Sequence, residues 1–98
     1  METFNQIING SQPVLVDFHA AWCGPCKAMS PSIAEVGKQV QGKARVLKLD
    51  VDRNRQMSMQ YNVSAVPTLI IFKNGQPVWR HSGMIDKNSL LNTLLSFA

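Results

Sequence analysis

The only two cysteines of this 98-residue chain lie three positions apart. They are Cys23 and Cys26, in the stretch AAWCGPCKAM at residues 20–29. Three kinds of chemistry use such a pair: metal binding, a structural disulfide, and reversible exchange between a dithiol and a disulfide. The rest of the sequence has to discriminate among them.

Metal binding and a structural disulfide are both poorly supported. A structural zinc site needs four ligands, usually two such pairs or one pair with histidines. The two histidines, His19 and His81, form no metal-ligand pattern with the cysteines, so we expect no metal. A disulfide that closes a loop of two residues removes little entropy from the unfolded chain. Thiol–disulfide exchange is therefore the favoured chemistry.

The pair is predicted to open a long helix. Apolar residues follow at helical spacing up to about residue 40, namely Met29, Ile33, Val36 and Val40. Unpaired backbone N–H groups and the positive end of the helix dipole meet at such a start, and they favour a thiolate at Cys23. We expect Cys26, one turn further on, to be more buried and less acidic. The pair would then combine one nucleophile with one sheltered resolving thiol.

A carboxylate interrupts the apolar run PVLVDF at residues 13–18, which is typical of a central strand buried on both faces. Burial of Asp17 there is costly and raises its pKa, so Asp17 is our candidate for taking the proton of the resolving thiol. Lys48, in ARVLKLDV at residues 44–51, lies on the predicted neighbouring strand and can reach it. The alternative is a solvated Asp17 at a strand end and a Lys48 that only faces water.

A proline opens a later predicted strand, in SAVPTLI at residues 64–70. Because proline cannot donate to the strand ladder, Pro67 marks either a simple strand start or a cis bond that aims the backbone outward. The second option would expose the backbone of Val66 to an extended peptide, which is β-strand addition. The residues alone leave both options open.

The expected elements alternate between helices and strands. They are a helix at 3–9 behind a Thr3 cap, a strand at 13–18, a helix at 24–40, a strand at 44–51, a helix at 53–61 capped by Asp52 and ended by Asn62, strands at 68–73 and 77–81 joined by Asn74-Gly75, and a last helix capped by Asp86. A strand, a helix and a strand in that order predict parallel strands with a right-handed crossover. We expect one α/β domain over residues 1–98, with helices on both faces of a mixed sheet.

Composition excludes several classes of function. The chain is 45% hydrophobic and 16% charged, as expected of a folded globular protein. Its net charge is +4, but the ten Lys and Arg are scattered and the densest patch is RNR at residues 53–55, so we expect no nucleic-acid partner. No apolar run reaches the roughly 18 residues of a membrane span. The start, METFNQIING, lacks the features of a secretory signal, so we expect a cytoplasmic protein.

Five segments in register resemble the thioredoxin family: VLVDF, WCGPC, KLDVD, VPTLIIFKNG and a lone Gly83 before the last helix. The resemblance covers nearly the whole chain from about Thr3. It implies the thioredoxin fold, a three-layer α/β/α domain, and the activity of a protein-disulfide reductase. In that activity Cys23 attacks a client disulfide and Cys26 resolves the mixed disulfide. Asp17 would transfer the proton and Lys48 would modulate it.

The resemblance also implies a cis bond before Pro67 and an apolar groove that receives the client's disulfide. The residues expected to frame that groove are Trp22, Gly24, Pro25, Val66, Pro67, Gly83 and Met84. The partners implied are disulfide-containing client proteins and a thioredoxin reductase, which would deliver electrons from NADPH. No cofactor is expected to be bound, and the Cys23–Cys26 disulfide is itself the redox-active group.

Two features depart from the family's pattern. Thioredoxins usually begin with an additional strand, which this chain is too short to contain, so we expect a four-stranded sheet with the strand at 45–51 at its edge. We expect a monomer, and dimerisation through that edge is the alternative.

His19 occupies a position that is commonly tryptophan, and it either affects the titration of the cysteines or serves as a smaller packing residue, which we favour. His81 is expected to be exposed and inert.

Two alternative functions deserve a test. The same fold can serve as a non-catalytic binding module, but a pure scaffold has no need for both thiols. It can also serve as a disulfide oxidase or isomerase. The Gly24-Pro25 pair between the cysteines resembles the reducing type and favours the reductase.

Overall fold

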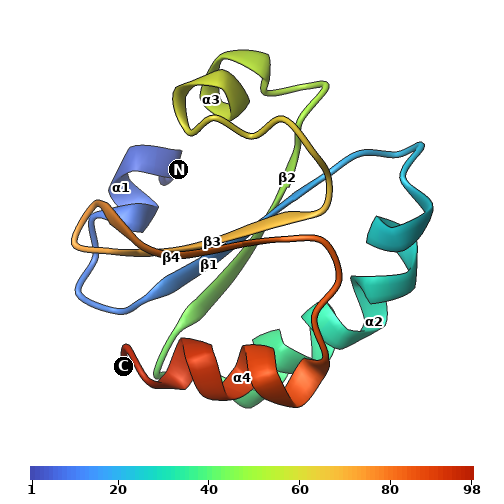
Figure 1. Cartoon of the computed structure of the whole chain (residues 1–98). Coiled ribbons are helices and arrows are strands. Elements are labelled where there is room, and N and C mark those ends of the chain that lie inside the picture. Colours follow the sequence, from blue (N-terminus) through green and yellow to red (C-terminus); the bar gives the residue numbers. More distant parts are fainter.

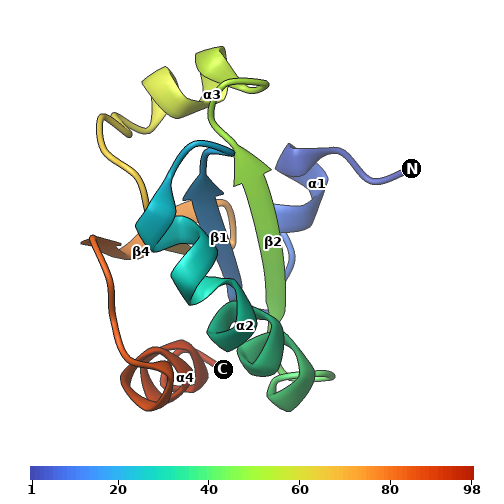
Figure 2. The same cartoon turned by 90° about the vertical axis from the view of Figure 1, so that its right-hand side faces the viewer.

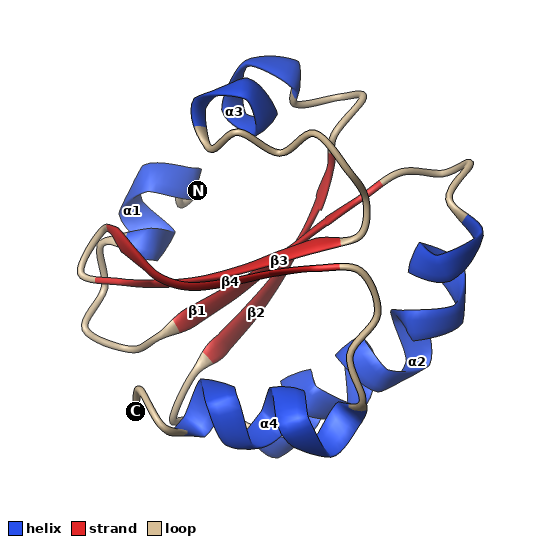
Figure 3. Ribbon diagram, viewed as in Figure 1, coloured by secondary structure: helices blue, strands red, loops and turns tan.

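The computed structural model describes all 98 residues, and its elements follow the order expected from the sequence. They are α1 (Phe4–Ile8), β1 (Val14–His19), α2 (Gly24–Gln39), β2 (Arg45–Asp50), α3 (Arg55–Gln60), β3 (Thr68–Lys73), β4 (Gln76–Ser82) and α4 (Lys87–Leu95). The sheet lies between α1 and α3 on one face and α2 and α4 on the other (Figures 1 and 3). The predicted three-layer α/β architecture is confirmed.

The four strands form one mixed sheet in the order β2-β1-β3-β4. β1 is parallel to β2 and antiparallel to β3, and β3 pairs antiparallel with β4. The expected position of β2 at an edge is therefore confirmed. In the register of β1 and β2, Asp17 lies opposite Lys48 and His19 lies opposite Asp50, so each of these pairs shares a face of the sheet.

Alternation along β1 divides the core in two. Val14, Val16 and Phe18 point to the cluster under α1 and α3. Leu15 points the other way and packs with residues of α2 and α4. Because side chains of a strand alternate between faces, Asp17 and His19 follow Leu15 onto the face that α2 covers. The strand therefore carries a carboxylate toward the helix that holds the cysteines.

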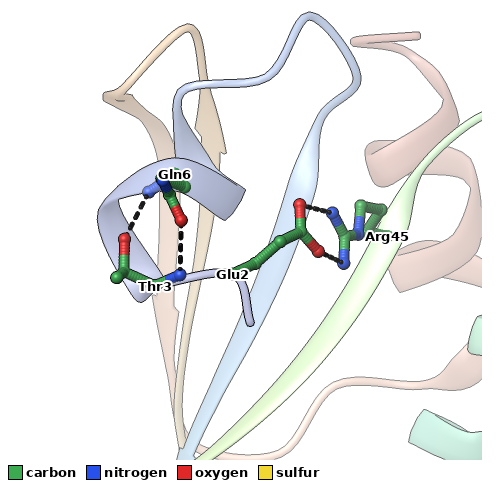
Figure 4. Close-up of polar contacts among 4 residues, drawn as sticks. All are labelled: Glu2, Thr3, Gln6 and Arg45. Carbon is green, nitrogen blue, oxygen red and sulfur yellow. Dashed lines mark hydrogen bonds and ion pairs between the residues drawn. The ribbon is translucent and has the colours of Figure 1, made fainter.

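The first helix is fixed at its N-terminus by local and distant contacts, which Figure 4 shows. The Thr3 hydroxyl accepts from the backbone N–H of Gln6, and the Gln6 side chain accepts from the backbone N–H of Thr3, which is a capping box. Beside it, both carboxylate oxygens of Glu2 accept from the guanidinium of Arg45, at 2.8 and 3.1 Å. The expected Thr3 cap is confirmed, and the ion pair joins the chain start to the beginning of β2.

Residues in the left-handed region of φ occur at two places where the sequence predicts them. Asn74 and Gly75 have φ angles of 52° and 81° and form the tight turn between β3 and β4. Asn62, with a φ of 56°, ends the segment that follows α3. The guanidinium of Arg80 on β4 donates to the carbonyls of Tyr61 and Asn62, which holds this end of the α3 segment against the sheet.

One predicted cap is wrong. Asp52 does not cap α3, because the N-cap is Asn54 and no side chain caps the helix there. The carboxylate of Asp50 accepts from the backbone N–H groups of Asp52 and Arg53, at 2.8 and 3.4 Å, and this turn delays the helix start. The predicted Asp86 cap of α4 is confirmed, since its carboxylate accepts from the N–H of Ser89 at 3.0 Å.

The helices are short compared with a bilayer, and none of them combines the length and the apolar character needed to cross a membrane.

Candidate active site

The two cysteines form a disulfide at the point where β1 ends and α2 begins. Their Cα atoms are 5.3 Å apart. Cys23 is the N-cap of α2, and its Sγ accepts from the backbone N–H of Cys26 at 3.1 Å. Figure 2 shows α2 beginning beside the carboxyl end of β1. The helix terminus therefore offers an N–H donor directly to the sulfur of Cys23, as the sequence predicts.

The expected difference in burial between the cysteines is wrong for the disulfide form. Cys23 is 4% exposed and Cys26 is 7% exposed, so neither is the sheltered partner. Both join a small cluster with Ala20, which packs against Val51 and Val66. The bond between the sulfurs holds both side chains in this cluster, and helical position alone does not decide their exposure.

An apolar hollow of about 100 Å³ adjoins this cluster, with which it shares Val51 and Val66. Its lining includes Trp22, Val51, Val63, Ser64, Ala65 and Val66. Trp22 is 70% exposed, and its indole Nε1 donates to the carboxylate of Asp52 at 2.9 Å. Asp52 thus fixes the orientation of the indole, a role that the sequence analysis missed because the partners are 30 positions apart. A larger open hollow, of about 440 Å³, lies over residues 52–57 and contains neither cysteine.

The structure brings several of the other predicted groove residues together. The bond between Val66 and Pro67 is cis, so of the two options left open by the sequence the cis bond is the one present. The backbone N–H of Gly83 donates to the Pro67 carbonyl at 2.9 Å. Gly83 has a φ of 96°, which a residue with a Cβ rarely adopts, and Met84 beside it is exposed. Gly24 and Pro25 lie between the cysteines, exposed at the helix start.

Asp17 is buried, with 3% of its surface exposed, on the face of β1 that α2 covers. Burial raises the pKa of Asp17, because the low-dielectric surroundings disfavour its charged form. The positive charges of His19 and, to a smaller extent, Lys48 oppose that rise. A buried strand carboxylate with a raised pKa is able to hold a proton at a pH where an exposed one does not.

Lys48 acts on Asp17 without contact. Its Nζ donates to the hydroxyl of Ser30 at 2.9 Å, and the side chain is exposed. The only ion pair of the chain is that between Arg45 and Glu2. The structure thus brings Lys48 and Asp17 to neighbouring positions of the sheet, but Lys48 influences the carboxylate through its field alone.

A polar cavity of about 340 Å³ lies beside Cys26. It is lined by His19, Ala20, Ala21, Cys26, Lys27, Ser30 and Lys48. The sequence does not single out Lys27 and Ser30, because a lysine and a serine on a helix surface carry no signal of their own. No three side chains among His, Cys, Asp and Glu are arranged to hold a metal ion.

The expectation that His81 is exposed is wrong. Its side chain is half-buried, and its ring stacks on that of Trp79 with the centroids 5.9 Å apart. Its Nε2 lies 3.1 Å from the carbonyl oxygen of Met84. Trp79 lies two residues earlier on the same face of β4, so its ring shields the ring of His81 from solvent.

The comparisons with known proteins agree with this site. The family model described as "Thioredoxin" matches residues 1–96. A thioredoxin of Rickettsia conorii is 44% identical over 87 residues, which are 89% of this chain and 83% of that protein. A bifunctional thioredoxin reductase/thioredoxin of Mycobacterium leprae is 43% identical over 91 residues, which are 93% of this chain and 20% of that protein. The solved structure of a mutant thioredoxin from Halobacterium salinarum superposes with a TM-score of 0.85 at 34% identity, covering 95% of this chain and 80% of that one.

A disulfide at the start of a helix, on a sheet of this topology, defines a thiol–disulfide oxidoreductase. With the family match and these identities, the chain belongs to the thioredoxin family.

The raised pKa of Asp17 predicts how its replacement changes stability. When folding raises the pKa of a carboxyl group, the folded state binds more protons, so stability falls as pH rises from the unfolded pKa through the folded one. Asp17→Asn in the oxidised protein should therefore raise the free energy of unfolding at pH 7 by about 1–3 kcal/mol. Urea unfolding of both proteins at pH 7 and near pH 4 would measure this difference, which should shrink at the lower pH.

Asp50→Asn provides the matched control, because Asp50 lies on the same face at the edge strand and is only half-buried. It should not raise stability at pH 7. An Asp17→Asn protein that is less stable than the wild type at pH 7 would contradict the burial argument.

Proposed function

We propose that residues 1–98 form a single thioredoxin domain of the WCGPC type, with a four-stranded sheet, that reduces disulfides of client proteins. The observation that carries the proposal is the pairing of two features at one place. Cys23 receives a backbone N–H at the start of α2, and a buried carboxylate, Asp17, lies on the sheet face beneath that helix. The first feature supports a nucleophile, and the second supports proton transfer.

In the proposed reaction, the thiolate of Cys23 attacks one sulfur of the client disulfide. The disulfide bond of the client breaks, one client sulfur leaves as a thiolate, and a mixed disulfide forms with Cys23. Asp17, as carboxylate, takes the proton from the thiol of Cys26. The resulting Cys26 thiolate attacks the sulfur of Cys23 and releases the second client thiolate. Two electrons pass to the client, and the Cys23–Cys26 disulfide seen in the structure is the product.

The apolar hollow beside the disulfide is the proposed site of client binding. The residues that would frame this site are Trp22, Gly24, Pro25, Val66, Pro67, Gly83 and Met84. The exposed faces of Trp22 and Met84 supply apolar contact, and the Val66 backbone beside the cis bond supports pairing with an extended client segment. An extended segment in this groove would bring its disulfide toward Cys23.

The proposed electron source is NADPH, delivered by a thioredoxin reductase, with no cofactor bound to this chain. The relative from Mycobacterium leprae joins a thioredoxin reductase and a thioredoxin in one protein, which supports this partnership. A protein recharged in this way works where NADPH and a reducing thiol pool are present, so we place it in the cytoplasm.

Replacement of each cysteine by serine should separate their roles. With NADPH, a thioredoxin reductase and insulin as the client disulfide, the wild type should turn over, and Cys23→Ser should lose at least about 10³-fold of the rate because the nucleophile is gone. Cys26→Ser should instead accumulate a covalent mixed disulfide with insulin, visible by non-reducing electrophoresis and mass spectrometry. Reversed behaviour of the two variants would overturn the assignment, and absence of turnover by the wild type would favour a binding module.

The redox potential should distinguish a reductase from an oxidase or isomerase. We expect the Cys23–Cys26 couple to equilibrate with glutathione or a thioredoxin of known potential at a value near the reducing end of the family, about −270 mV. The measurement is the fraction of disulfide against the redox buffer, read by thiol labelling. A value well above roughly −200 mV would contradict the reductase proposal.

We propose that the protein is a monomer. The edge strand β2 carries Arg45 and Lys48, and charged side chains on an edge strand oppose pairing with another chain. Sedimentation velocity at increasing concentration should give one species with the mass of a single chain, in both the oxidised and the reduced protein. A dimer that grows with concentration would contradict this proposal and favour association through β2.

A further inference from the structure

The polar cavity described above faces only one of the two sulfurs. Cys26 lines it and Cys23 does not, so it belongs to the resolving side of the disulfide. His19, Lys27, Ser30 and Lys48 supply its polar wall. Every group in that wall except the serine hydroxyl carries or can carry a positive charge, which is the sign that stabilises a thiolate or a carboxylate nearby.

His19 is the polar wall residue that shares a strand with Asp17. It lies two residues further along β1 and on the same face, about 6.6 Å away along the strand. The buried Asp17 carboxylate accepts no hydrogen bond from the protein. Every side-chain oxygen of a buried residue that has no partner still keeps some contact with solvent. A trace of the carboxylate surface is therefore open. His19 and Lys48, its neighbours on the same face of the sheet, line the polar cavity, although Asp17 itself is not among the lining residues.

The other charged side chains around His19 are two lysines and an aspartate. Lys48 on β2 and Lys27 on α2 line the same cavity as His19. Asp50, the register partner of His19 on β2, accepts from two backbone N–H groups. Histidine is the side-chain type whose charge ordinarily changes between about pH 5 and 8. His19 is the only histidine among the residues that line this cavity.

We propose that His19 is a positioning residue for the resolving step, because its charge controls how readily Asp17 takes the proton of Cys26. This inference rests on the proposed function, in which Asp17 is the proton acceptor. It assigns to His19 an electrostatic role in place of the packing role that the sequence favours.

The direction of the effect follows from the charges. While the imidazole carries its proton, its positive charge holds Asp17 as a carboxylate, which is then a weaker base. Once the imidazole is neutral, the affinity of Asp17 for a proton rises, so its carboxylate is the stronger base. The Cys26 thiolate then attacks the sulfur of Cys23 and expels the client thiolate. The proton on Asp17 finally leaves to water, and no further oxidant or reductant takes part.

The titration of Asp17 itself tests the proposal. Carbon-13 NMR would follow its carboxyl group in the oxidised protein, where the cysteines do not titrate, and Asp17→Asn would identify the signal. We expect the midpoint to lie at higher pH in His19→Gln, which is never charged, than in His19→Lys, which stays charged. In the wild type, the Asp17 signal should show an added step that coincides with the titration of the His19 ring. Equal midpoints in the two variants would overturn the proposal, because a packing residue has no reason to distinguish them.

The resolving step gives a second, kinetic readout. Release of the client thiol from a mixed disulfide on Cys23 would be timed by rapid mixing at pH 6 and pH 8. The ratio of the rates at pH 8 and pH 6 should differ about threefold from that of the wild type in both His19→Gln and His19→Lys, since neither variant changes charge in this range. His81→Gln, at the chain's other histidine and outside the cavity, should keep the wild-type ratio. An unchanged ratio in both His19 variants would count against the proposal.

The two proposals fail in different ways. If the wild type shows no turnover with the reductase and insulin, the proposed function fails, while the Asp17 titrations still decide the electrostatic coupling to His19. If the wild type turns over and the titrations of His19→Gln and His19→Lys coincide, only the role of His19 fails.

Discussion

The burial of β1 on both faces is the constraint on which this site depends. Layers of helices cover the strand from both sides, and its side chains alternate between two apolar clusters. A carboxylate placed in such a strand cannot be fully solvated, so Asp17 prefers its protonated form more than an exposed aspartate does. The same strand ends directly before the helix that carries the cysteines. The burial of β1 therefore raises the pKa of Asp17 and also places its carboxylate near the helix that carries the cysteines.

Two different environments lie near the disulfide, and they suit two different tasks. On the side of Trp22 and Val66 the surface is apolar, which suits contact with a polypeptide segment of a client. On the side of Cys26 the cavity is polar and cationic, which suits handling of a proton and of a transient thiolate. A symmetric environment would leave the two thiols interchangeable. Burial of the Asp17 carboxylate costs stability, and the surroundings of the two cysteines differ.

Local patterns in the sequence were sufficient to predict the helices and strands and the cysteine pair at the centre of the site. Helical spacing, the strand-like run around Asp17, the Asn74-Gly75 turn and the caps at Thr3 and Asp86 each depend on residues that are close in the chain. Their physical causes are backbone geometry and capping, which act over a few positions. The motif around the cysteines adds the family, and the family adds the expectation of a four-stranded sheet with the strand at 45–51 at its edge, which no local pattern contains.

Side-chain partners across the fold were decided only by the tertiary structure. Asp52 turned from an expected cap into the acceptor of the Trp22 indole, because the carboxylate of Asp50 already occupies the turn before α3. Lys48 bonds to Ser30 of α2 in place of Asp17, although the sheet register puts it beside that carboxylate. The sequence by itself determined which residues are present at the reaction centre and which elements carry them. The three-dimensional packing decided which charges face each other, because that depends on distances between segments that are remote along the chain.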